Sequence, residues 1–174
     1  MSFYGDIAGA DAYHMARGNA AWSGIDSLKE AALVRGSDYV DQRYRWPTTC
    51  GRWQSMFAGE RTAGRAQDRE WPRTGAVDYS GNTIPDSEIP TEVKNAAYEA
   101  AFRELVSPGS LSPDFIPSGH KIRVKVDIIE VGYSAPVEGD NNMPNRPIIP
   151  TIDEILAPLT FRPGYGCGVS VIVV

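Results

Sequence analysis

Apolar residues recur at helical spacing in residues 27–46, where they fall on two neighbouring stripes that form one broad face. The stripes are Leu28, Ala32 and Tyr39, and Leu33, Val40 and Tyr44. Ser27 and Glu30 have the spacing of a capping box and predict the start of this helix, and Pro47 predicts its end. Gly36 lies within the helix, where we expect it to allow a close approach by a second helix.

A second long helix is predicted from Pro90, because proline is favoured at a first helical position. Its apolar face carries small side chains that would let a partner helix come close: Val93, Ala97, Ala100, Ala101 and Leu105. Pro108 and Gly109 end it. A short helix is predicted within residues 10–19, ending at Gly18 and Asn19.

The connection between the two long helices, residues 46–90, has no sustained period of 2 or 3.6. Loops of this length inside a compact domain are uncommon and are usually functional or held against a partner. Several aromatic side chains argue against disorder, so we expect the loop to be ordered by packing them on the helices. They are Trp46, Trp53, Phe57, Trp71 and Tyr79.

Residues 120–133 alternate apolar and polar positions and predict a half-buried strand, in which the doubled Ile128-Ile129 indicates a bulge or a turn. We therefore predict a mainly α fold: a small helical bundle core with a long ordered loop, a β-strand or hairpin element and an extended C-terminal arm. Residues 1–133 would form the helical core, with the loop at 46–90 and the β element at 120–133. Residues 134–174 would form an extended linker and a docking arm.

Composition adds limits to this picture. The 174 residues carry a net charge of −5, which does not indicate bulk attraction to nucleic acid or to an anionic membrane. The charge is uneven, because residues 35–73 contain eight arginines and five acidic residues. Two cysteines far apart in sequence suit a reducing cytoplasm. With no signal-peptide pattern and no apolar run long enough for a membrane span, we expect a soluble protein made in the cytosol.

Residues for catalysis or metal binding are not grouped in this sequence. His14 and His120 each stand without a carboxylate or cysteine at ligand spacing, and a lone histidine is usually structural or exposed. Cys50 has no histidine motif beside it, and the glycine-rich "GYGCG" is not followed by the lysine and helix of a phosphate loop. We therefore expect no enzymatic activity, no cofactor and no metal.

The segment Arg69-Glu70-Trp71-Pro72-Arg73-Thr74-Gly75, which we call the Trp71 block, has two readings. Arginines follow phosphates and tryptophans stack on bases, which would make it part of a single-stranded-DNA interface. The full set for that interface is Arg43, Arg45, Arg52, Arg61, Arg65, Arg69 and Arg73, interleaved with Trp46, Trp53 and Trp71. The reading we favour is a structural bracket: Trp71 fills a pocket at the helix pair, Pro72 and Gly75 shape the turn, and Arg69 or Arg73 pairs with an acid.

The C-terminal "VSVIVV" is a short, uncharged segment with high β-propensity, which would be an aggregation hazard if exposed. It would either fold back as a strand or be buried against another subunit by strand addition. The preceding "IDEILAPLTF" is a second candidate anchor for a groove. The partner-binding residues we predict are Ile155, Leu156, Leu159, Phe161, Val169, Val171, Ile172 and Val173.

Four segments follow one another in an order that resembles a bacteriophage protein family: "ADAYHMARGNAAW", "EAALVRGSDYVDQRYRW", "RTAGRAQDREWPRTGA" and "IPTEVKNAAYEAAFREL". Its members are commonly labelled DnaT-like single-stranded-DNA-binding proteins, and the chain also resembles the head–tail connector, or adaptor, proteins of tailed phages. "IDEILAPLTF" is similar to the ending of the same family.

The connector resemblance implies a structural virion protein. Such a protein would form a homo-oligomeric ring, expected to be a dodecamer, between the portal and a tail, neck or stopper protein at the capsid–tail junction. DNA would pass through its channel without specific binding, and no membrane would be involved. The alternative implied by the family label is a single-stranded-DNA-binding protein.

Overall fold

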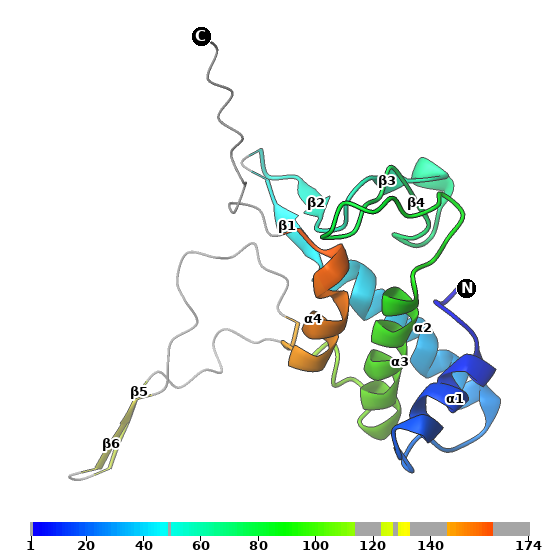
Figure 1. Ribbon diagram of the computed structural model, residues 1–174. Helices are drawn as coiled ribbons and strands as arrows, with labels where there is room; N and C mark the ends of the chain where they lie inside the picture. Colours follow the sequence, from blue (N-terminus) through cyan, green and yellow to red (C-terminus); the bar gives the residue numbers. More distant parts are fainter. Residues whose placement is uncertain (1, 49, 114–122, 127–128, 133–145, 162–174) are drawn as a thin grey trace.

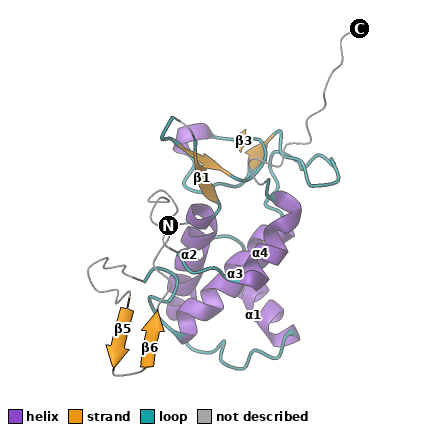
Figure 2. Cartoon of the chain, turned by 90° about the vertical axis from the view of Figure 1, so that its left-hand side faces the viewer, coloured by secondary structure: helices purple, strands orange, loops and turns teal. Residues whose placement is uncertain are grey.

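Three helices, α2, α3 and α4, lie side by side in the computed structural model, with α1 at one end of them and the short strands β1–β4 at the other (Figures 1 and 2). The structure describes residues 2–48, 50–113, 123–126, 129–132 and 146–161. The helices are α1 (Ile7–Ala16), α2 (Asp26–Arg43), α3 (Thr91–Val106) and α4 (Pro150–Leu156), which continues into the 3₁₀ turn η3 (Ala157–Leu159). The predicted mainly α class is confirmed.

The crossing of α2 and α3 is the most extensive helix contact among the described residues, and glycine makes it possible. A Cβ atom added to Gly36 would lie 2.6 Å from the carbonyl oxygen of Ala97 and 2.7 Å from the backbone nitrogen of Ala101. Ala97 and Ala101 are fully buried, so the small face predicted for α3 does meet another helix. Close approach of the two backbones therefore depends on the absence of a side chain at position 36.

The predicted boundaries of α2 were wrong at both ends. The helix begins at Asp26 with Ile25 as its N-cap residue, and no side chain caps it, so the capping box at Ser27 is not formed. The helix stops at Arg43, because the following residues leave it to pair as strand β1. Leu28, which we expected on the buried face, is 55% exposed because it lies in the first turn, before the buried positions of the helix begin.

The connection at 46–90 contains regular structure that its sequence pattern does not reveal. Strand β1 (Arg45–Pro47) pairs antiparallel with β2 (Trp53–Ser55), β3 (Glu60–Arg61) pairs antiparallel with β4 (Arg73–Thr74), and a 3₁₀ turn η1 (Gly64–Ala66) lies between β3 and β4. Two aromatics, Phe57 and Trp71, pack into the core as expected. Trp53 is 50% exposed and Tyr79 74% exposed, so only part of the aromatic set orders the loop.

The predicted β element is a hairpin of β5 (Arg123–Val126) and β6 (Ile129–Gly132). The strands are antiparallel with Val126 opposite Ile129, so the chain reverses where the doubled isoleucine indicated a bulge or a turn. Residues 127–128, between the two strands, lie outside the described residues, so the bulge or turn predicted at Ile128-Ile129 is described only at Ile129.

Part of the predicted docking arm belongs to the core. We expected residues 134–174 to be an extended linker and arm, but α4 packs in the main cluster of buried side chains, with Ile152 and Leu156 fully buried. The reason is that these residues repeat at helical spacing and meet the apolar surface of the same chain. Thr160 and Phe57 form an isolated β-bridge, which brings the end of this segment to the strand end of the helices.

Candidate functional site

Trp71 is a core residue of this fold. Its side chain is 2% exposed and lies among buried residues of α2, α3 and α4. Its ring meets Phe57 edge to face, with centroids 5.7 Å apart. The indole nitrogen is buried and donates to no described acceptor, so the contribution of this side chain is packing. The side chain therefore cannot stack on a base unless it leaves the core. A buried Trp71 is what the bracket hypothesis predicts.

Arg69 is paired with acidic residues of α2. Its Nη1 donates to Asp38 Oδ1 at 2.6 Å and to Asp41 Oδ2 at 3.3 Å, and its Nη2 donates to the backbone carbonyl of Ser2. Its side chain is 10% exposed. The salt bridges to Asp38 and Asp41 hold the pKa of the guanidinium above its usual value, even though burial acts in the opposite direction.

Asp41 joins the Trp71 block to the N-terminal segment. Tyr4 donates to Asp41 Oδ1 at 2.5 Å, and the Tyr4 oxygen accepts from the backbone N–H of Trp71 at 3.1 Å. Burial raises the pKa of Asp41 to about 6, although hydrogen bonds from Tyr4 and Arg69 oppose the shift. Burial, with the nearby Asp41 carboxylate, also raises the pKa of Tyr4. These hydrogen bonds connect the N-terminal segment, α2 and the Trp71 block.

Arg73 is enclosed by the loop that it supports. Its Nη1 donates to Glu70 Oε2 at 2.7 Å, its Nε donates to the carbonyl of Ala58 at 2.8 Å, and its Nη2 donates to the carbonyls of Phe57 and Gly59 at 3.3 and 2.5 Å. Its side chain is 6% exposed. All three nitrogens of the guanidinium donate to acceptors of the same chain, so its hydrogen-bonding capacity is largely used within the fold.

Gly75 and Pro72 occupy the turn expected of them. Gly75 has φ +69°, a left-handed conformation that side chains disfavour, and the Trp71–Pro72 peptide is cis. One structural unit therefore contains Trp71, Pro72, Arg73 and Gly75. Arg69 and Arg73 are both paired with acidic residues of the same chain.

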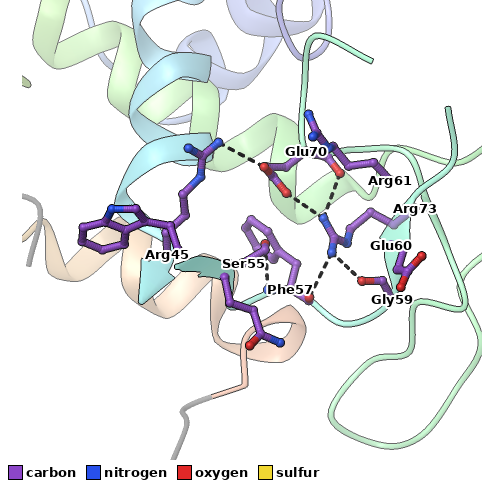
Figure 3. Close-up of a pocket in the computed structure, with 10 residues that line it drawn as sticks. Arg45, Ser55, Phe57, Gly59, Glu60, Arg61, Glu70 and Arg73 are labelled. Atoms are coloured by element: carbon purple, nitrogen blue, oxygen red, sulfur yellow. Dashed lines mark hydrogen bonds and ion pairs between the residues drawn. The ribbon is translucent and has the colours of Figure 1, made fainter. Parts of the chain in front are cut away.

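A polar cavity of about 480 Å³ opens beside this unit (Figure 3). Glu70 lies between two arginines there: its Oε1 accepts from Arg45 at 3.1 Å, and its Oε2 accepts from Arg73. The side chain of Arg45 is 37% exposed, so it faces both the carboxylate and solvent. The lining residues are Arg45, Trp53, Gln54, Ser55, Phe57, Gly59, Glu60, Arg61, Glu70 and Arg73.

The arginines and tryptophans predicted for a DNA interface do not form one surface. Arg69, Arg73 and Trp71 are used in the core, whereas Arg52 and Arg65 are exposed. What remains beside the cavity is Trp53, with Arg45 and Arg61. Sequence reasoning missed this cavity because its lining comes from β1, β2, β3 and the Trp71 block, which carry no shared motif.

Of the residues considered for catalysis, His14 has structural surroundings. His14 is 1% exposed, with Nε2 3.1 Å from the Tyr98 carbonyl oxygen and Nδ1 3.1 Å from Asn19 Nδ2, and burial lowers its pKa. Cys50 is exposed, and His120 lies outside the described residues. Within the described ranges, no three His, Cys, Asp or Glu residues gather in a metal-binding group, and no helix is long and apolar enough to cross a membrane.

The predicted partner-binding residues fall into three groups. Leu156 and Leu159 are buried in this chain's own core, and Ile155 packs against it, so the same chain covers them. Phe161 is 46% exposed and remains accessible. The remaining four lie outside the described residues: Val169, Val171, Ile172 and Val173.

Comparisons with known proteins identify a family for this chain. The model of the family described as "Putative DnaT-like ssDNA binding protein" matches residues 3–174. A search of curated proteins and a search of solved structures each returned no match. Because the family model spans nearly the whole chain, including the Trp71 block and all four described α-helices, this protein belongs to the DnaT-like ssDNA-binding protein family.

Proposed function

We propose that this chain is a structural subunit of a tailed-phage virion, an adaptor between the portal and the tail or neck proteins. Copies of the chain would form a ring, expected to be dodecameric, that extends the DNA channel at the capsid–tail junction. The chain would have no enzymatic activity and need no cofactor. The support comes from the resemblance of its ordered motifs to connector proteins and from the state of the Trp71 block.

The internal use of the Trp71 block is the observation that carries the proposal. Arg69 pairs with Asp38 and Asp41, Arg73 pairs with Glu70, and Trp71 is 2% exposed. The segment that most resembles a DNA-binding platform thus supports the loop instead. A net charge of −5 also suits a channel through which DNA slides, because few phosphate contacts would hold it.

The proposal is tested on particles of a phage that encodes this chain. Purified virions should contain the protein, and micrographs with a bound antibody should place it at the head–tail junction. Removing the protein should leave heads and tails unjoined. Virions that lack the protein, or that join normally without it, would contradict the adaptor role.

Single-stranded-DNA binding is the second candidate, favoured by the family description and by the exposed Trp53 at the polar cavity. An indole that is 50% exposed beside Arg45 and Arg61 offers a stacking face with nearby positive charge. Stacking of a base on an aromatic side chain contributes about 1–3 kcal/mol. Glu60 and Glu70 line the same cavity and oppose a phosphate there.

A titration of labelled single-stranded DNA with purified full-length protein separates the two candidates. An adaptor should bind weakly, without saturation, at both 50 and 200 mM salt, values chosen because phosphate contacts are salt-sensitive over that range. Saturable binding with a steep salt dependence, weakened about 5- to 150-fold by Trp53→Ala, would favour the second candidate. Tyr79→Ala is the matched control, because Tyr79 is 74% exposed and does not line the cavity.

A further inference from the structure

An apolar groove lies where the C-terminal end of α3 meets the segment that leads into α4. Its volume is about 330 Å³. Val106 lines the groove with 56% of its surface exposed, and Ile148, between the lining residues Pro147 and Ile149, is 70% exposed. The lining residues are Phe102, Arg103, Val106, Ser107, Ser110, Leu111, Pro147 and Ile149. Exposed apolar side chains beside an open apolar groove are typical of a docking surface.

The same sequence contains an occupant of matching chemistry. Residues 163–174, which lie outside the described residues, include no charged side chain. In an extended strand, Val169, Val171 and Val173 would point to one face, because successive side chains alternate. A cavity of about 150 Å³ holds one benzene-sized group. A groove twice that size therefore suits two or three valine side chains.

The starting point of this segment and the groove lie at opposite ends of α4. Phe161 donates its backbone N–H to the carbonyl of Met56 at 2.8 Å, so the segment starts at the strand end of the helices. The groove is lined by Pro147 and Ile149, which precede α4, whereas Phe161 follows the 3₁₀ turn at the other end of α4. A contact between a site at one end of a subunit and a site at the other end is heterologous, and such contacts build rings or filaments.

We propose that the apolar segment 169–174 of one copy binds the groove between α3 and residues 147–149 of the next copy. The segment joins successive subunits head to tail and covers an apolar surface that the described part of the chain leaves open. This inference rests on the self-association in the proposed function, and it specifies the two surfaces that carry it.

Two full-length variants, each lacking one half of the contact, test the proposal. Val106→Asp places a charge in the groove, at a side chain exposed enough for the fold to tolerate it. Val171→Asp combined with Val173→Asp places charges on the segment. Wild-type protein should self-associate in sedimentation velocity, whereas each variant alone should associate at least tenfold more weakly. A mixture of the two variants should form one-to-one dimers that grow no further, since one working segment meets one working groove.

Controls separate this contact from other effects of added charge. Leu28→Asp adds a charge at an exposed apolar residue outside the groove and should leave self-association unchanged. Ser170→Asp adds a charge on the other face of the segment and should weaken association less than the double variant. All samples need a reductant, because Cys50 is exposed.

The proposal is overturned if the mixed variants form no dimer, or if wild-type protein stays monomeric over the accessible concentrations. It is also overturned if Leu28→Asp weakens association as much as Val106→Asp. These results concern only the segment and the groove. Rings built through other contacts would still join heads to tails, so the particle experiment judges the adaptor role separately.

Discussion

Asp41 shows how one buried carboxylate links three parts of the chain. It accepts from Tyr4, it pairs with Arg69, and it lies near the backbone N–H of Glu70. Only 5% of its surface is exposed, which disfavours the charged form and raises its pKa from 3.8 to about 6. Because the folded state binds this proton more tightly than the unfolded state, the group makes stability depend on pH.

The contribution of Asp41 to the free energy of unfolding is fully present below pH 4 and is lost as the pH rises through about 6. Asp41→Asn cannot titrate and should flatten this part of the profile. When the pH rises from 4.5 to 7.5, the wild-type protein should lose about 1–3 kcal/mol more of its free energy of unfolding than the variant. Urea denaturation of both proteins at both pH values measures this difference.

Asp38→Asn is the control, because Asp38 binds the same arginine with a side chain that is 45% exposed. If Asp41→Asn leaves the pH profile unchanged, burial does not raise the pKa of this carboxyl.

At the residue scale, the Trp-Pro-Arg-Thr-Gly pattern was sufficient to predict a buried Trp71 and a turn at Gly75. The link from Tyr4 to Asp41 was not predictable, since the two residues are 37 positions apart and share no pattern.

The crossing of α2 and α3 depends on contact between their backbones. Replacing glycine by alanine within a helix normally stabilises it by about 1 kcal/mol. At Gly36 the added methyl group would meet Ala97 and Ala101 at distances under 3 Å, and these are backbone atoms that cannot rotate away. Gly36→Ala should therefore destabilise the protein by about 1–3 kcal/mol.

Urea denaturation compares Gly36→Ala with wild type, and circular dichroism checks that the helical content is retained. The double variant that adds Ala101→Gly should remain destabilised, because removing the Ala101 side chain leaves its backbone in place. A higher midpoint for Gly36→Ala, as at an ordinary helical glycine, would contradict the close crossing.

The long helices were predictable because each repeats its apolar residues over three or more turns. Pro90 marked the start of α3 to within one residue: we predicted it at the first helical position, and it is the N-cap residue of a helix that begins at Thr91. The strands β1–β4 were missed because each has only two or three residues, too few to establish a period of two. These strands are defined by their pairing with another segment, and a local sequence pattern does not reveal that pairing.

At the scale of the whole molecule, the sequence indicated an apolar anchor in residues 152–161 but could not indicate which surface covers it. The same spacing of Ile152, Leu156 and Leu159 would suit a groove on another subunit. The structure places these side chains in the chain's own core. A hydrophobic face indicates that these side chains are buried but does not indicate which surface buries them. Only the three-dimensional arrangement distinguishes burial within the chain from burial against another subunit.

Leu156→Ala tests that arrangement. The side chain is fully buried, so its truncation should lower the free energy of unfolding by about 2–5 kcal/mol. The loss should be the same at protein concentrations twentyfold apart, because the contacts lie within one chain. A loss that changes with protein concentration and becomes small at the lowest one would assign Leu156 to a neighbouring subunit.

The anchored N-terminal segment affects how the protein can be tagged for any of these measurements. The backbone carbonyl of Ser2 accepts from Arg69, and the ring of Tyr4 is 1% exposed beneath the loop. A bulky fusion joined directly to Ser2 would compete with these contacts. An affinity tag at this end therefore needs a flexible spacer and cleavage before biophysical work. At the other end, a tag would crowd the segment that we propose for subunit contact.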